Sequence, residues 1–310
     1  MKYPQKLFKG SLFALACALC ACGSDDSNSQ NPSTPENGGN DSTESSASVE
    51  PSSAGSPSNE YSSAESSAPQ ALILSFEEEM ARDSLFVQAS ADTGFSTIES
   101  VYQNLASDER VVFLIRHAKR ITKTSKEATL VYAGKVQAQQ VGAKLASDES
   151  FAYGHTDFVR TQETAENIAL GRGEEFPGSI VMPELTENWY IKDAERLAVY
   201  DTINNPSLIY SKWAYNNEYS DAFYDLKERC VRAITEVILP NISQTKRVNI
   251  FVSHDMFIGP LTVYCTNKKI NRLRYWETDM WVYFVSGIAI VIKPNGERRY
   301  IPIDGIEYDT

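Results

Sequence analysis

Histidine and cysteine are scarce in this chain, which has only three His and five Cys among 310 residues. After the first 22 residues, neither CxxC nor HxxxH spacing occurs, so nothing resembles a zinc site, and we expect no metal and no cofactor. The later part of the chain keeps only Cys230 and Cys265. Two Cys do not make a disulfide framework, so one bridge and two buried thiols both stay open.

Residues 23–70 lack basic side chains altogether, with eight acids and no Lys or Arg. The stretch is rich in Ser, and its low hydrophobicity with one sign of charge prevents it from burying enough surface to fold. We expect a flexible, disordered tether there, followed by one folded domain at residues 71–310. Without this stretch and the three Lys of residues 1–22, 26 basic and 33 acidic residues remain. This mildly acidic balance argues against a nucleic-acid partner.

No apolar run is long enough to span a bilayer comfortably, and the longest early one is residues 11–21 (SLFALACALCA). It follows a basic start, as in an export signal, and ends in LCACG. That ending resembles the bacterial lipobox, in which a peptidase cuts before a lipidated Cys. We expect residues 1–22 to be a lipoprotein signal peptide and Cys22 to carry the lipid that holds the protein to a membrane of the bacterial cell envelope. A plain secretory signal is the alternative.

From residue 71 onward, apolar strands alternate with amphipathic helices. Val111–Ile115 (VVFLI) is wholly apolar, which is typical of a central parallel strand covered on both faces, and Val248–Val252 (VNIFV) is expected to be a second buried strand. The alternation predicts an α/β domain, a three-layer αβα sandwich whose mostly parallel central sheet carries helices on both faces. Further helices are expected at Ser96–Leu105, Ala133–Leu145, Arg160–Ala169 and Asp221–Val237, and further strands at Trp281–Val285, Ile288–Ile292 and Arg299–Ile303.

Both of the apolar strands run directly into a histidine. Val111–Ile115 is followed by Arg116-His117, and Val248–Val252 by Ser253-His254. Ligands of open α/β sheets bind beyond the carboxyl ends of the strands. If the two strands are neighbours, both histidines therefore meet in one crevice.

The motifs around these histidines follow one another in the order of a known family. Arg116-His117-Ala118 stands where that family has Arg-His-Gly, and Leu185-Thr186-Glu187 stands where it has Leu-x-Glu. In order and spacing, residues 108–305 resemble the histidine phosphatase superfamily, in its smaller, phosphoglycerate-mutase-like branch 1. The other matching residues are Gly134, Gln137, Ala138 and Gly142 in one predicted helix, Arg160, Thr164 and Ala165 in the next, and Ser253-His254.

The resemblance implies phosphoryl transfer through a covalent intermediate on His117. The neutral imidazole attacks phosphorus with one nitrogen, while an acceptor such as a backbone carbonyl holds the other. Arg116 and Arg160 offer planar forks that match phosphate oxygens, and His254 donates a further hydrogen bond. These cationic side chains supply the charge, so no metal is needed.

The general acid has two candidates. Glu187 matches the acid of branch 1 and is favoured, whereas Asp255 follows the second His, as in the acid-phosphatase branch of the superfamily. Each is also explained as a surface acid or a helix cap. Lys119 and Arg120 either bind a second anionic group of the substrate or form a solvated basic run.

The sequence thus predicts a metal-independent phosphatase that hydrolyses a small phosphomonoester through phosphohistidine. A degenerate phosphatase fold that binds a phosphorylated ligand without turnover is the alternative from another class. A phosphomutase is less favoured, because its phosphorylated priming cofactor should be scarce outside the cytoplasm. The substrate itself is not identified.

Overall fold

The computed structural model of this chain describes residues 75–81, 94–271 and 282–305. All of them belong to one compact unit, Ser63–Thr310. The expected signal peptide and tether, with the lipidation site Cys22, lie outside the described residues. In the described ranges, no helix combines the length and apolar character needed to cross a membrane.

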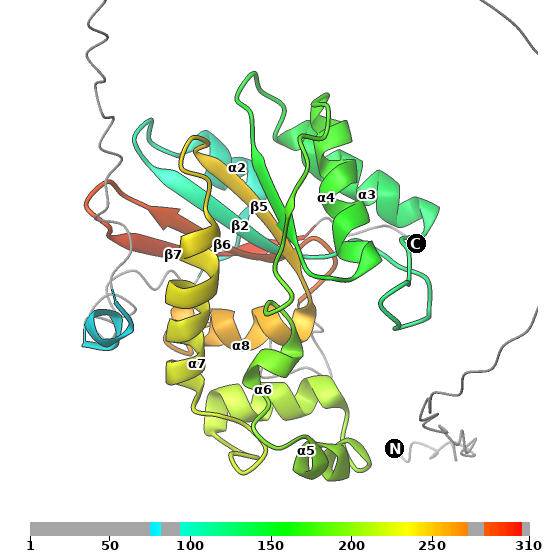
Figure 1. The fold of residues 1–310 in the computed structure, drawn as a ribbon, viewed down its shortest axis with the longest axis vertical. Coiled ribbons are helices and arrows are strands. Elements are labelled where there is room, and N and C mark those ends of the chain that lie inside the picture. The colour runs from blue at the N-terminus through cyan, green and yellow to red at the C-terminus, as the bar shows by residue number, and fades with distance from the viewer. Residues whose placement is uncertain (1–74, 82–93, 272–281, 306–310) are drawn as a thin grey trace, which may run out of the picture. The chain divides into compact units, whose positions relative to one another are not determined.

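A seven-stranded mixed sheet forms the centre of the domain, with strand order β1-β7-β6-β2-β5-β3-β4 (Figure 1). Its middle strand, β2, pairs in parallel with β5 and antiparallel with β6. The strands are β1 Ser96–Thr97, β2 Arg110–Arg116, β3 Ala152–His155, β4 Ile180–Val181, β5 Val248–Ser253, β6 Gly287–Ile292 and β7 Arg298–Asp304. The two strands that precede the histidines, β2 and β5, are therefore neighbours, as expected.

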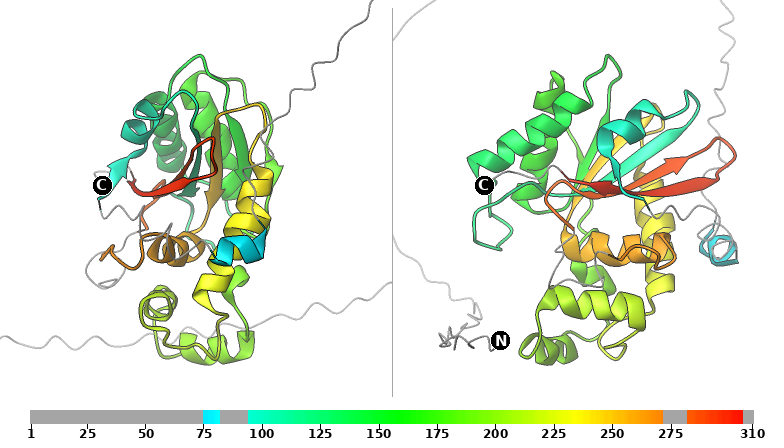
Figure 2. Two further views of the ribbon diagram at one scale, coloured as in Figure 1. Left: turned by 90° about the vertical axis from the view of Figure 1, so that its left-hand side faces the viewer. Right: turned by 180° about the vertical axis from the view of Figure 1, so that it is seen from behind.

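Helices cover both faces of this sheet, which confirms the three-layer α/β architecture. The α-helices are α2 Ile98–Gln103, α3 Tyr132–Lys144, α4 Val159–Arg172, α5 Ala194–Asp201, α6 Pro206–Asn216, α7 Leu226–Arg232 and α8 Asp255–Cys265. The side view in Figure 2 places α7 across the sheet from α2, α3 and α4. Along β2, Val112 and Leu114 pack into one core with α6, α7 and α8, while Val111, Phe113 and Ile115 pack into the other with α2, α3 and α4. A strand buried on both faces has no polar side to show, which explains the unbroken apolar run.

Two predicted elements, one near the end of the chain and one between β4 and β5, differ from the structure. Residues 282–285 form a turn rather than a strand, and Trp281 lies outside the described residues. The helix expected from Asp221 begins only at Leu226, because Asp225 caps it by accepting from the Glu228 amide at 2.9 Å. It then continues as a π-helical turn, Ala233–Ile238, and a 3₁₀ turn, Leu239–Asn241.

Two smaller predictions are also resolved. The helix expected over Ser96–Leu105 spans only Ile98–Gln103, because Ser96–Thr97 pairs with β7 as an edge strand. Cys230 and Cys265 are both buried thiols and are not joined in a disulfide. Of the two alternatives, one bridge or two buried thiols, the structure has the second.

Candidate active site

The two histidines meet at the carboxyl edge of the sheet. Ile115 is aligned with Val252 and Arg116 with Ser253, so His117 and His254 leave their strands at the same level. Their ring centroids are 5.5 Å apart. The two histidines therefore lie close together at this edge of the sheet, as the strand pattern predicted.

His117 is held as a neutral imidazole with one nitrogen engaged. Its side chain is almost wholly buried, and Nδ1 lies 2.8 Å from the Ala118 carbonyl oxygen. Because a carbonyl only accepts, Nδ1 carries the proton and Nε2 keeps its lone pair. Burial, followed by the charges of Arg116 and His254, holds the pKa of His117 well below its usual value. The tautomer is thus the one that a nucleophilic Nε2 needs.

Helices α3 and α4 fix the loop that carries His117. The Ala118 amide donates to Thr164 Oγ1 at 3.0 Å, and Thr164 in turn donates to the Arg160 carbonyl at 2.7 Å. Gln137 accepts from the Lys119 amide at 3.3 Å. At Gly134 any Cβ would collide with the Lys119 carbonyl, so only glycine permits this approach of α3. Three of the residues that carried the family resemblance, Gly134, Gln137 and Thr164, therefore hold the His117 loop.

Arg116 is clamped between a carbonyl and a carboxylate. Nη1 donates to the Val282 carbonyl oxygen at 2.7 Å, and Nη2 lies 3.0 Å from Asp255 Oδ2. Its Cζ lies 4.4 Å from the ring centre of Phe284. The turn at residues 282–285 supplies the Val282 and Phe284 contacts and passes through Val285, whose φ of 55° is unusual for a β-branched residue. The turn that replaces the expected strand is therefore part of the site.

Arg160, at the start of α4, reaches the second histidine. Its Nη2 lies 3.4 Å from His254 Nδ1, and His254 Nε2 lies 3.0 Å from Thr156 Oγ1. Arginine has no acceptor, so His254 Nδ1 accepts and the ring is neutral. Burial, followed by Arg160 and Arg116, lowers the pKa of His254 to about 3. Burial and Arg120 lower the pKa of Arg160 to about 10. Positive charges therefore lie close together around the two histidines, which favours an anion there.

The two candidate acids differ in their surroundings. Glu187 begins the 3₁₀ turn Glu187–Tyr190 and is half-buried; burial, followed by the charge of Asp255, raises its pKa. Asp255 begins α8, accepts from the Met256 amide at 3.0 Å and pairs with Arg116. Glu187 is thus the acid whose surroundings favour a bound proton.

The adjacent basic residues also differ from each other. Arg120 is half-buried, donates to the Ile121 and Lys123 carbonyls at 2.8 and 2.7 Å, and lowers the pKa of both Arg160 and His254. The Lys119 side chain is exposed. Within the described ranges, no group of three or more His, Cys, Asp or Glu side chains is placed to hold a metal ion.

A comparison with known protein families finds one family that matches this arrangement of residues. The model of the histidine phosphatase superfamily (branch 1) matches residues 112–283, which include both histidines, both arginines and both acids. This chain belongs to branch 1 of the histidine phosphatase superfamily. A comparison with curated proteins finds no match.

Among solved structures, the chain is similar to three bacterial proteins at low identity. Phosphoglycerate mutase from Bacillus anthracis is 15% identical, over 64% of this chain and 93% of that one, with a TM-score of 0.41. A mycobacterial glucosyl-3-phosphoglycerate phosphatase is 12% identical, over 63% and 97%, with a TM-score of 0.40. YhfR of Bacillus stearothermophilus is 17% identical, over 64% and 98%, with a TM-score of 0.43.

Several contacts of this histidine phosphatase site were not foreseen. Thr156, whose hydroxyl contacts His254, was not among the residues assigned from the sequence. The Val282 carbonyl had no signal at all, because a backbone oxygen looks the same at every position. Phe284, whose ring centre lies 5.8 Å from that of His117, belonged to a predicted strand.

Proposed function

We propose that this histidine phosphatase hydrolyses phosphomonoesters without a metal ion, through a phosphohistidine on His117. The observation that carries the proposal is the hydrogen bond from His117 Nδ1 to the Ala118 carbonyl, 2.8 Å long. It leaves the lone pair on Nε2 in a crevice that also holds Arg116 and Arg160. Without that fixed tautomer, the same residues would serve equally well for binding alone.

The proposed reaction has two displacements at phosphorus. In the first, Nε2 of His117 forms a bond to phosphorus, the bond to the ester oxygen breaks, and Glu187 gives its proton to the leaving alkoxide. In the second, water attacks the phosphohistidine, its proton passes to Glu187, the P–N bond breaks and inorganic phosphate leaves. Arg116 and Arg160 stabilise the charge on the equatorial oxygens in both steps.

Glu187 is proposed as the acid because its pKa is raised by burial, so that it carries a proton closer to neutral pH. Asp255 is proposed to hold Arg116, which it contacts at 3.0 Å. His254, which now accepts from Arg160, would gain a proton and donate to the phosphate once a dianion offsets the arginine charge.

The experiment measures phosphate release from an aryl phosphate in the presence of a chelator, together with trapping of the phosphoenzyme. We expect turnover and an acid-labile, alkali-stable phosphoprotein, both lost in His117→Ala. Full activity of His117→Ala would exclude this mechanism. Ligand binding without phosphate release over hours would identify a binding module, and transfer of phosphate between positions of one substrate would identify a mutase.

We also propose that the protein is exported and anchored in the bacterial cell envelope through lipid on Cys22. The support is the basic start, the short apolar run and the LCACG ending. Metabolic labelling with a fatty acid should mark the wild type but not Cys22→Ser. Labelling of Cys22→Ser, or an uncleaved cytoplasmic wild type, would contradict the anchor.

A further inference from the structure

A buried pair of threonine hydroxyls lies beside the second histidine. Thr156 directly follows β3, Thr161 lies in the first turn of α4, and neither residue is exposed to solvent. Thr156 Oγ1 lies 3.0 Å from His254 Nε2 and 3.0 Å from Thr161 Oγ1. Thr161 Oγ1 in turn lies 2.6 Å from the Phe158 carbonyl oxygen and 3.1 Å from the Thr156 carbonyl oxygen. Two hydroxyls therefore join the ring of His254 to the backbone.

The second histidine differs from the first in the kind of group that holds it. A backbone carbonyl, which only accepts, fixes the proton of His117 on Nδ1. The partner of His254 is a hydroxyl, which can donate or accept. Thr156 alone would therefore allow the proton on either nitrogen of that ring, and a further group must set the direction of the hydrogen bond.

The hydroxyl of Thr161 sets this direction. Two carbonyl oxygens compete for its single proton, so its oxygen accepts from Thr156, and Thr156 in turn accepts from His254 Nε2. On the other side of the ring, Arg160 can only donate, and its Nη2 lies 3.4 Å from Nδ1. Both sides therefore require the same tautomer, with the proton on Nε2 and the lone pair on Nδ1.

We propose that Thr161 is a positioning residue, which keeps Nδ1 of His254 free for the proton that the ring gains on phosphate binding. The inference rests on the proposed function and adds a residue to it. When the ring becomes an imidazolium, Nδ1–H donates to the phosphate, and Nε2–H already has its acceptor in Thr156.

Loss of the Thr161 hydroxyl should reverse this arrangement. Thr156 would then turn its proton toward Nε2 of His254, and the proton of the ring would move to Nδ1, against the N–H groups of Arg160. Forming the imidazolium would require Thr156 to turn back and would leave its buried hydroxyl without an acceptor, which is unfavourable.

The first measurement is the ¹⁵N spectrum of the full chain with labelled histidine. At neutral pH, well above its lowered pKa of about 3, His254 is uncharged. The chain has only three His, so substituting each in turn assigns the signals. A protonated ring nitrogen and a bare one differ in chemical shift, and the spectrum therefore reports the tautomer directly. We expect the proton of His254 on Nε2 in the wild type and in Thr161→Ser, but on Nδ1 in Thr161→Val, which has no hydroxyl.

The second measurement is kcat/KM for an aryl phosphate in the same variants. We expect Thr161→Val to lose about tenfold or more, the effect of one unpaired buried hydroxyl, and Thr161→Ser to stay within about twofold of the wild type. Thr235→Val is the matched control, because it removes a buried hydroxyl that donates only to a backbone carbonyl, that of Val231 at 2.9 Å. It should change neither the tautomer nor kcat/KM. If Thr161→Val does not fold, as judged by circular dichroism, Thr161→Ala replaces it.

The two measurements separate failure of the positioning role from failure of the proposed function. A proton that stays on Nε2 in Thr161→Val, or that is already on Nδ1 in the wild type, would overturn the role of Thr161. Full activity of Thr161→Val, or an equal loss in Thr161→Ser, would overturn it as well. No phosphate release by the wild type would overturn the proposed hydrolysis. A tautomer that changes in Thr161→Val but not in Thr161→Ser would then still support the control of His254 by Thr161.

Discussion

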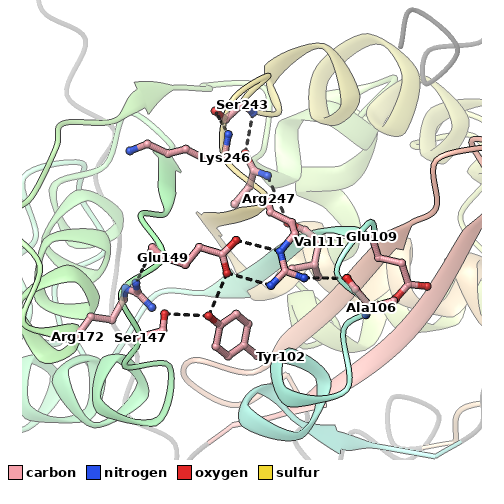
Figure 3. A network of polar contacts seen from close by, with 11 residues as sticks. Tyr102, Ala106, Glu109, Val111, Ser147, Glu149, Arg172, Ser243, Lys246 and Arg247 are labelled. Atoms are coloured by element: carbon pink, nitrogen blue, oxygen red, sulfur yellow. Dashed lines mark hydrogen bonds and ion pairs between the residues drawn. The ribbon is translucent and has the colours of Figure 1, made fainter. Parts of the chain in front are cut away.

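The two ends of the central strands carry similar residues in opposite arrangements. At the amino ends, arginines meet carboxylates: Arg247 contacts both oxygens of Glu149 at 3.0 and 3.1 Å, and Arg299 contacts both oxygens of Glu109. Figure 3 shows Glu149 held between Arg247 and the Tyr102 hydroxyl. At the carboxyl ends, Arg160 faces a histidine and is further affected by Arg120 and Arg116.

Because of this difference, we expect the amino ends of the strands to contribute to stability and the carboxyl ends to contribute to activity. Arg247 joins the loop before β5 to Glu149, in the segment before β3, and to the Ala106 carbonyl in the segment before β2. Its charge is neutralised by the fold itself. The positive charge at the carboxyl ends is offset within the fold mainly by Asp255 and Glu187, so an incoming phosphate completes the balance. Changes at one end should therefore alter unfolding, and changes at the other should alter turnover.

The largest effect is expected from Glu187→Gln. A positioned general acid contributes about 10²–10⁴-fold, so kcat on an alkyl phosphate should fall by that range. The fall should be much smaller with p-nitrophenyl phosphate, whose leaving group needs little protonation. Because the raised pKa describes the active, protonated acid, wild-type kcat should decline as pH rises through that pKa, and this alkaline limb should vanish in the variant.

Asp255→Asn is the matched control for the acid. It should weaken the hold on Arg116 and mainly raise KM. The alkaline limb should be kept but move to lower pH, because the charge of Asp255 helps to raise the pKa of Glu187. If Asp255→Asn lost more kcat on alkyl phosphates than Glu187→Gln, Asp255 would be the acid, and the comparison of the two carboxylates would be reversed.

A second prediction concerns Arg160→Ala, which removes charge from the carboxyl end. Losing one preorganised donor to the transition state costs about 10²–10³-fold in rate, and we expect that loss in kcat/KM. The free energy of unfolding should change little, because relief from the charges of Arg120 and Arg116 offsets the lost attraction to Glu187 and Asp255 and the lost hydrogen bond to the Ser125 carbonyl. Steady-state kinetics and urea unfolding on the same preparation measure both. A large loss of stability with modest loss of rate would show that Arg160 serves the fold instead.

The third prediction is the counterpart at the amino end, Arg247→Ala. It removes two hydrogen bonds to Glu149 and one to the Ala106 carbonyl, and we expect a loss of about 2 kcal/mol in the free energy of unfolding. The kcat of the folded enzyme should stay within about twofold, since the site lies at the other end of the strands. Arg196→Ala breaks a more exposed pair with Asp221 and should have a much smaller effect. If both variants lost the same free energy of unfolding, Arg247 would stabilise the fold no more than an exposed ion pair does.

The sequence predicted those features of the two ends that depend on residues close together in the chain. The strands β2 and β5 and the helices α3 and α4 were predictable, because their apolar runs and motifs are local. The order of the strands was not, and the adjacency of β2 and β5 was an expectation that only the sheet resolved. Arg116, His117, Arg160 and His254 were assigned from the family motifs, whose spacing is regular.

The parts that were missed depend on contacts between distant segments. The turn at residues 282–285 reads as a strand from its Val, Tyr and Phe, but its backbone bends to meet Arg116, which is 166 residues away. Tyr210 of α6 and Val263 of α8 line the same small pocket, and neither residue indicates the other in the sequence. The π-helical end of the α7 segment has no pattern of its own. Local propensity predicts elements, whereas these features arise from tertiary packing.

The smallest expected effect tests the charge imbalance without any chemistry. Inorganic phosphate at ten times its dissociation constant should stabilise the fold by about 1.4 kcal/mol, because a ligand that binds only the native state shifts the equilibrium by mass action. Thermal unfolding with phosphate, against chloride at equal ionic strength, measures this. The shift should persist in Arg247→Ala and disappear in Arg160→Ala, since only the second removes charge from the carboxyl end. A phosphate shift that survived in Arg160→Ala, or that vanished in Arg247→Ala, would place the anion somewhere other than the crevice between the two histidines.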